Sequence, residues 1–292
     1  MTGPIPDHQI DVSFELFPPK TDAGLETLNK AAGRLAEVGP EYFSVTYGAG
    51  GGTRERTARV VRMVAQSTGL PVAHHLTCVG ASRAEVDAQA RALWDSGIRR
   101  IVALRGDLPE GETLAEDGYH DAAELAAGLR KVADFDIAVA AYPEVHPEAS
   151  SAQGDIDHLK RKLDAGANCA ITQYAFETDT VLRFIDRARA AGITAPIVPG
   201  IMPVANFASI KRFSEGCGAS IPDWMEEMFA GLDEAPDMHA MVATYLAAQQ
   251  CQRMIDAGID AFHFYTLNKP DLSLAICRAL GIPVGPAKAV AA

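Results

Sequence analysis

Apolar residues along this chain gather in short runs of strand length, separated by longer stretches with helical spacing. Buried strands of a parallel sheet typically read as nearly continuous apolar runs. The pattern therefore predicts strands in eight places: Val12–Phe17, Tyr42–Tyr47, Pro71–Thr77, Ile101–Leu104, Ile137–Tyr142, Cys169–Gln173, Ala195–Pro199 and Phe262–Leu267.

The stretches between these runs repeat apolar residues every three or four positions. In Gly24–Val38, for example, the side chains of Leu25, Leu28, Ala32 and Leu35 share one helical face. Glycine is the usual left-handed residue after a helix, because it has no Cβ to clash there. Glycines stand where several of these stretches end, at Gly39, Gly97, Gly166, Gly192 and Gly258.

The alternation of strands and helices predicts an α/β fold of the (β/α)8 TIM-barrel type, with an extended helical segment before the last strand. We expect one catalytic domain over residues 11–284, a disordered or extended segment at 1–10 and a flexible tail at 285–292. A doubly wound sheet is the alternative. It would place a glycine-rich phosphate-binding turn after its first strand, whereas the cluster GAGGGT, 48–53, follows the second.

Charge and cysteine content narrow the class of protein. The 292 residues carry a formal net charge of −12, which argues against a nucleic-acid partner. The sequence has no apolar run long enough to span a membrane and no secretory signal at its start. Its five cysteines form no C-x-x-C pair, so neither a disulfide framework nor a zinc site is indicated. We therefore expect a cytoplasmic protein without a membrane partner.

Polar residues stand where most of the predicted strands end. In a parallel barrel the active site lies at the C-terminal ends of the strands. Seven of the eight runs carry polar or ionisable groups there, and the seventh run, which leaves through Pro199, does not. The predicted mouth therefore includes Glu15, Thr46, Tyr47, His75, Arg105, Asp107, Tyr142, His146, Gln173 and Lys269.

Two other kinds of site are possible on the same residues but are not favoured. Glu144 and His146 are metal-ligand types, yet no third or fourth ligand stands near them in sequence. Cys78 ends a strand, but no base is identifiable beside it, so a catalytic thiol is not indicated.

Two pairs of residues have both a structural and a functional interpretation. His74 and His75 are adjacent in a strand, so one side chain points into the barrel and the other away from it. Asp155 and Lys162 are seven residues apart and share a helix face. They are either a solvated surface pair or groups directed at a ligand across the barrel mouth.

Segments along nearly the whole chain, from about residue 10 to 284, resemble methylenetetrahydrofolate reductase of the bacterial, single-domain type. The resemblance is carried by FELFPPK (14–20), VTYGAGGGTRERT (45–57), HLTCVG (75–80), IVALRGDLP (101–109), YPEVHPEA (142–149), KRKLDAGANCAITQ (160–173), IVPGIMPVANF (197–207) and HFYTLNKPDLSLAIC (263–277).

The resemblance implies a (β/α)8 flavoprotein that binds FAD. Such an enzyme reduces 5,10-methylenetetrahydrofolate to 5-methyltetrahydrofolate with NADH or NADPH, and the two substrates use one site in turn, in ping-pong fashion. The same site could run in reverse in one-carbon catabolism. The resemblance further implies a cytoplasmic homo-oligomer of one-carbon metabolism and methionine biosynthesis.

Site residues also follow from the resemblance. Glu15 corresponds to the general acid, and Asp107 to a carboxylate between the flavin and the folate pterin. Substrate contacts correspond to Gln173, Ser209, Phe213 and Lys269; relatives often carry arginine at position 269 and glutamine at position 209. Flavin contacts correspond to Thr46, Tyr47, Ala49, His75, Arg105, Gly106, Asp107, Tyr119, Tyr142, His146, Asp155 and Lys162.

This chemistry gives a reason for a carboxyl group inside an apolar strand. An acid must hold its proton near neutral pH, and burial favours the protonated form of a carboxyl group. Other functions remain as alternatives. A barrel lyase or isomerase using a Schiff base would need a lysine within a strand, and the run at 195–199 has none. A flavin- or folate-binding barrel without turnover would not need Glu15.

Overall fold

The computed structural model describes residues 10–47, 54–107 and 115–285. The expected terminal segments therefore lie almost entirely outside the described residues and stay predictions, as does the glycine cluster with Ala49. Among the helices of the described ranges, none combines the length and apolar character that a membrane span requires.

The described residues form one sheet of nine parallel strands, in the order β7-β6-β5-β4-β3-β2-β1-β9-β8. Eight of these strands overlap the runs that the sequence predicts, and β8 lies directly after the predicted run 195–199. The strands are β1 (Asp11–Leu16), β2 (Tyr42–Val45), β3 (Val72–Thr77), β4 (Arg100–Leu104), β5 (Asp136–Ala141), β6 (Cys169–Thr172), β7 (Ile197–Val198), β8 (Gly200–Ile201) and β9 (Ala261–Tyr265).

The seventh predicted strand is present as two short strands on either side of Pro199. β7 pairs with β6, and β8 pairs with β9. The Pro199 carbonyl accepts the His263 N–H at 2.9 Å. The chain thus passes from one edge of the sheet to the other at a proline, which has no N–H to give to a ladder, and this crossing closes the ring. The predicted TIM-barrel fold is confirmed, with its seventh strand split in two.

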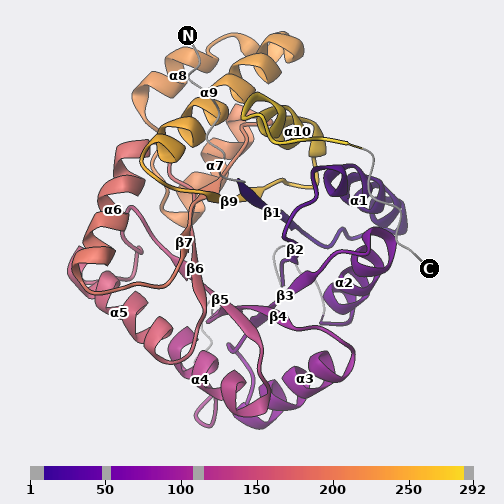
Figure 1. The fold of residues 1–292 in the computed structure, drawn as a ribbon, viewed down its shortest axis with the longest axis vertical. Helices are drawn as coiled ribbons and strands as arrows, with labels where there is room; N and C mark the ends of the chain where they lie inside the picture. The colour runs from indigo at the N-terminus through magenta and orange to yellow at the C-terminus, as the bar shows by residue number, and fades with distance from the viewer. Residues whose placement is uncertain (1–9, 48–53, 108–114, 286–292) are drawn as a thin grey trace.

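Helices surround the strands in an almost complete ring, and α7, α8 and α9 lie together on one side (Figure 1). These three are the extended helical segment expected before the last strand. The helices are α1 (Asp22–Leu35), α2 (Arg54–Thr68), α3 (Arg83–Asp95), α4 (Ala122–Val132), α5 (Ala152–Asp164), α6 (Thr178–Ala190), α7 (Phe207–Cys217), α8 (Asp223–Phe229), α9 (Pro236–Asp256) and α10 (Pro270–Ala279), with short 3₁₀ turns at Ala36–Val38 and Leu232–Glu234.

Strand alternation separates the packing residues from the polar ones. On β1, the side chains of Val12, Phe14 and Leu16 join the main apolar cluster with residues of the surrounding helices. Ser13 and Glu15 alternate with them and so face the barrel interior. The apolar run therefore packs one face of β1 against helices and presents a carboxyl group on the other.

His74 lies on the outer face of β3 and is fully buried. Neither of its ring nitrogens has a hydrogen-bond partner among the described residues. Burial lowers its pKa from 6.5 to about 4. The His74 ring therefore binds a proton more tightly in the unfolded chain than in the folded one. Above pH 6.5 this difference has no effect on stability, and as the pH falls from 6.5 toward 4 it lowers the free energy of unfolding.

We expect His74→Leu to remove much of this acid sensitivity. A shift of this size corresponds to about 3 kcal/mol of unfolding free energy between pH 6.5 and 4. Urea unfolding at several pH values measures it, with a leucine at the exposed His120 as the matched control. Equal pH dependence in wild type and His74→Leu would contradict the assignment.

Candidate active site

Glu15 lies at the barrel mouth beside two buried histidines. Its backbone pairs with Ser44 of β2 and Tyr265 of β9. Its Oε2 lies 3.5 Å from Nε2 of His75 and 3.7 Å from Nε2 of His263. The Glu15 side chain keeps 20% of its surface exposed, against 7% and 1% for the two histidines. The two buried histidines therefore contact the carboxyl group from the barrel interior, and part of its surface remains exposed at the mouth.

Burial keeps two of the groups around Glu15, His75 and Tyr265, neutral at neutral pH. Burial lowers the pKa of His75 to about 4, although the nearby Glu15 opposes that shift. Burial and the charge of Glu15 raise the pKa of Tyr265 well above its usual range, and its hydroxyl donates to the Thr172 carbonyl at 2.8 Å. Nδ1 of His263 lies 2.7 Å from the Ser13 hydroxyl. Glu15 is therefore the carboxyl group of this cluster, and buried rings surround it on the inner side.

A second group forms where β4 and β5 end. The Arg105 guanidinium makes a two-point ion pair with Glu148, at 2.6 and 3.0 Å, and this contact raises its pKa. Burial raises the pKa of Tyr142 to about 12, and the charges of Asp155 and Asp107 act in the same direction. Asp107 is exposed. Electrostatic interactions thus connect four of the predicted flavin contacts: Arg105, Asp107, Tyr142 and Asp155.

His146 and Gly106 complete this group. The His146 backbone N–H donates to Oδ2 of Asp155 at 2.9 Å, and its ring stands edge-on to Tyr142 with ring centres 4.5 Å apart. Gly106 has a φ of 87°, and a Cβ there would lie 2.6 Å from Cγ1 of Val79. Glycine suits both conditions, because it adopts a positive φ without strain and leaves room for the side chains of Val79 and Thr77.

Two predicted flavin contacts point elsewhere. The Tyr119 hydroxyl donates to Oδ1 of Asp87 on α3 at 2.8 Å, and its ring packs on Gly128 of α4. Lys162 is 4% exposed, and its Nζ donates to the Ala140 carbonyl at 2.5 Å. Burial lowers the Lys162 pKa to about 8. The structure therefore does not bring these two to the mouth, and their role in binding flavin stays a prediction.

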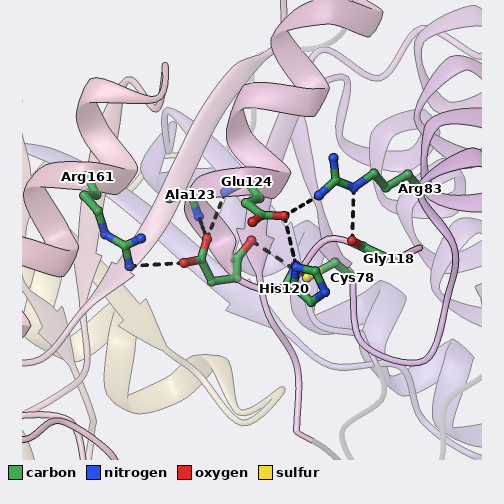
Figure 2. A network of polar contacts seen from close by, with 8 residues as sticks. Cys78, Arg83, Gly118, His120, Ala123, Glu124 and Arg161 are labelled. Atoms are coloured by element: carbon green, nitrogen blue, oxygen red, sulfur yellow. Dashed lines mark hydrogen bonds and ion pairs between the residues drawn. The ribbon is translucent and has the colours of Figure 1, made fainter. Parts of the chain in front are cut away.

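A polar network holds the residues that directly precede α4 (Figure 2). Arg83 binds both the Gly118 carbonyl, at 3.0 Å, and Glu124, at 2.7 Å. Asp121 caps α4 through the backbone N–H groups of residues 123 and 124, and Arg161 of α5 binds its other oxygen at 3.1 Å. The network links α3, α4 and α5 to one another.

The expected substrate contacts lie around the ends of β6, β8 and β9. Gln173 follows β6, and its Oε1 accepts the Tyr174 N–H at 3.0 Å. Ser209 and Phe213 are on α7, and the Phe213 side chain is 55% exposed. Lys269 caps α10 and, like Asn206, lines a cavity of about 540 Å³ between the start of α7 and the turn after β9. Lys269 therefore borders this hollow, whereas Ser209 and Phe213 are not among the residues that line it.

Two buried polar atoms at the mouth lack a hydrogen-bond partner among the described residues. They are Oγ1 of Thr46 and Nε2 of His75; the 3.5 Å contact of His75 with Glu15 is an ion-pair distance and not a hydrogen bond. Buried polar groups nearly always find partners, so orphaned ones point to a ligand. Both are predicted flavin contacts. Tyr47 also follows β2, at the same end of the barrel.

The other chemistries weighed above gain no support. Cys78 is buried, and burial raises the pKa of its thiol to about 11. Glu144 accepts the Ser220 N–H at 2.9 Å, and the His146 ring accepts the Glu148 N–H at 3.1 Å. Across the described ranges, no three His, Cys, Asp or Glu side chains converge as metal ligands.

Sequence reasoning missed several residues that hold the site. The segment that carries Glu15 is contacted by His263, Thr266 and Asn268. Ser13, two residues before Glu15, binds the ring of His263. Their contacts with β1 join residues about 250 positions apart. The one available signal was the alternation of His263 with Phe262 and Phe264, which places a histidine on the inner face of the last strand.

The closed parallel barrel, with its ionisable groups at the C-terminal strand ends, defines a TIM-barrel enzyme. Comparison with known proteins specifies which kind. The sequence model of the family described as methylenetetrahydrofolate reductase matches residues 4–281. The chain belongs to this family.

Bacterial relatives match this chain over nearly their full length. The 5,10-methylenetetrahydrofolate reductase of Salmonella typhimurium is 50% identical over 95% of this chain and 93% of its own. That of Escherichia coli is 48% identical over the same shares. A maize relative, methylenetetrahydrofolate reductase (NADH) 1, is 36% identical over 94% of this chain and 49% of its own length. These matches support methylenetetrahydrofolate reductase function.

Solved structures support the fold. An uncharacterized protein from Clostridium thermocellum, described as binding two copies of 5-methyl-5,6,7,8-tetrahydrofolic acid, superposes with a TM-score of 0.65 at 14% identity, over 94% of this chain and 96% of its own. At this identity the similarity shows the barrel architecture alone.

Proposed function

We propose that the protein binds FAD at the barrel mouth and uses NADH or NADPH to reduce 5,10-methylenetetrahydrofolate to 5-methyltetrahydrofolate. The observation that carries the proposal is the Glu15 carboxyl group, which lies 3.5 Å from a neutral His75 and remains open to the mouth of a barrel of this family. This arrangement suits a general acid, because the carboxyl group is held in place and accessible to substrate.

The residues present fit FAD. Thr46 and His75 offer the two orphaned polar atoms, and Arg105 and the neutral Tyr142 would hold the flavin on the β4–β5 side. When bound, FAD would accept a hydride from the nicotinamide and deliver it to the folate. His146 and Asp155 would join the same site, held to each other by their 2.9 Å hydrogen bond.

Glu15 supplies the proton for the folate reaction. The five-membered ring of the substrate must open before a hydride adds to it, and protonation of N10 by Glu15 makes that nitrogen a leaving group. The product of ring opening is a 5-iminium cation. Asp107 is exposed at the mouth, so its carboxylate would stabilise this cation electrostatically.

Residues at the ends of β6, β8 and β9 would recognise both substrates in turn. Gln173 and the exposed Phe213 would contact whichever substrate occupies the site, and this shared use would give ping-pong kinetics. Lys269 would meet the carboxylates of the folate. Ser209, on the first turn of α7, would add a polar contact to the folate.

The visible spectrum of the purified protein tests cofactor binding. We expect flavin absorption bands, release of FAD on denaturation and loss of the bands when NADH or NADPH is added without oxygen. Phe213→Ala is the matched control, because this exposed side chain is assigned to substrate and should leave FAD content unchanged. A colourless protein to which added FAD does not bind would contradict the proposal.

A further inference from the structure

The turn Thr266–Lys269 follows β9 and contacts the end of β1 through side chains. The ladder between these two strands ends where Glu15 pairs with Tyr265. Beyond that point, the Thr266 hydroxyl donates to the Glu15 carbonyl at 2.6 Å. Asn268 then accepts the Phe17 N–H at 3.0 Å and donates to the Phe17 carbonyl at 2.8 Å. Its amide thus replaces a backbone peptide group and extends the pairing past Glu15.

The turn is itself held in an uncommon conformation. Leu267 and Asn268 both have positive φ values, 48° and 57°, in the left-handed region. Asparagine tolerates this region, but leucine adopts it only with backbone strain. The Asn268 N–H donates to the Thr266 hydroxyl at 3.1 Å, and the Lys269 N–H donates to the Thr266 carbonyl at 2.8 Å. Such strain persists where the surrounding contacts over-determine the backbone, and it is concentrated at functional sites.

We propose that the turn Thr266–Lys269 is a positioning element for the general acid. Thr266 and Asn268 fix the backbone of Glu15–Phe17 from β9, while the same turn carries Lys269 to the substrate hollow. One rigid connection therefore sets the place of the acid relative to the cation expected to bind the folate. The inference rests on the proposed role of Glu15 as that acid.

Substitutions at Asn268 separate its backbone conformation from its hydrogen bonds. Asn268→Gly accepts a positive φ without strain but has no amide, and Asn268→Asp keeps the size of the side chain but loses the donor. We expect both to slow the folate half-reaction by about 10- to 10²-fold, the scale for a misplaced catalytic group. Reduction of the bound flavin by NADH should stay within about threefold of wild type, since that half-reaction needs no proton from Glu15.

Thr266 provides a matched pair. Thr266→Val keeps the shape and loses the hydroxyl, so it should slow the folate half-reaction in the same way. Thr266→Ser keeps the hydroxyl and should restore most of the rate. Because a purely structural role would also lower stability, the melting temperature of each variant is measured beside the two half-reactions.

The decisive experiment combines Asn268→Gly with Glu15→Gln and follows single turnovers of both half-reactions by stopped flow. We expect no further slowing of the folate step in the double variant, because an absent acid cannot be misplaced. Three results would each overturn the positioning role. Asn268→Gly could slow the folate step equally with and without Glu15, the NADH step could be slowed, or the folate step could be unchanged in both Asn268 variants. If Glu15→Gln alone leaves the folate step intact, the assignment of the acid is wrong, and this inference fails with it.

Discussion

Glu15→Gln is expected to stop folate reduction while leaving NADH oxidation by the bound flavin nearly unchanged. Glutamine keeps the size of the side chain but has no proton to give to N10 of the folate. General acid catalysis contributes about 10² to 10⁴ in rate, so the folate half-reaction should fall by that factor. Rapid mixing that follows the flavin band in each half-reaction separately measures both effects.

The matched control is Glu26→Gln on α1, because Glu26 is an exposed glutamate outside the barrel mouth. It should leave both half-reactions unchanged. If the two half-reactions fall together in Glu15→Gln, then Glu15 has a structural or binding role and the carboxyl group between His75 and His263 is not the acid.

Asp107→Asn is expected to separate the half-reactions in a different way. The carboxylate repels the electron density that arrives when the flavin is reduced, so its removal should raise the flavin midpoint potential. The same carboxylate stabilises the folate iminium ion, so its removal should slow the folate step by about 10²-fold, the scale for loss of one electrostatic stabiliser. NADH should still reduce the flavin. The contact with Glu148 chiefly raises the pKa of Arg105, and burial chiefly raises that of Tyr142; the charge of Asp107 adds to both shifts, so it acts on this group.

A structural interpretation of Asp107 makes the opposite prediction. Aspartate is common in turns, and Asp107 could serve mainly to hold the turn after β4. In that case Asp107→Asn would lower the melting temperature and leave the potential unchanged. Asp95→Asn, an exposed aspartate at the end of α3, is the control for loss of a surface charge. The midpoint potential and the melting temperature of the same variant decide between the two roles.

The sequence was sufficient to predict the barrel, because its evidence is local. Apolar runs alternate with stretches of helical spacing along the chain. Apart from the seventh, each apolar run corresponds to one strand, and one or more helices follow it. The split at Pro199 was not predicted, although the proline was visible, because the crossing depends on the pairing partners β6 and β9. Glu15 was identified as a candidate because a carboxyl group in an apolar strand is unusual within a single segment.

The rest of the site depends on contacts that no single segment shows. His263 and Asn268 reach β1 from about 250 residues away, so their role appears only once the barrel closes. Tyr119 was assigned by resemblance to the flavin, whereas the structure places its hydroxyl on Asp87, where Gly128 leaves space for the ring. The side of the loop on which an aromatic ring packs depends on tertiary contacts that neither local pattern nor motif encodes.

The central claim is that one site at the barrel mouth carries a hydride from a nicotinamide to a folate. An anaerobic double-mixing experiment on the wild-type protein tests it most directly. The account predicts that NADH or NADPH bleaches the flavin band, and that 5,10-methylenetetrahydrofolate then restores it with one equivalent of 5-methyltetrahydrofolate formed. A flavin that the nicotinamide does not bleach, or a band that the folate fails to restore, would contradict the account.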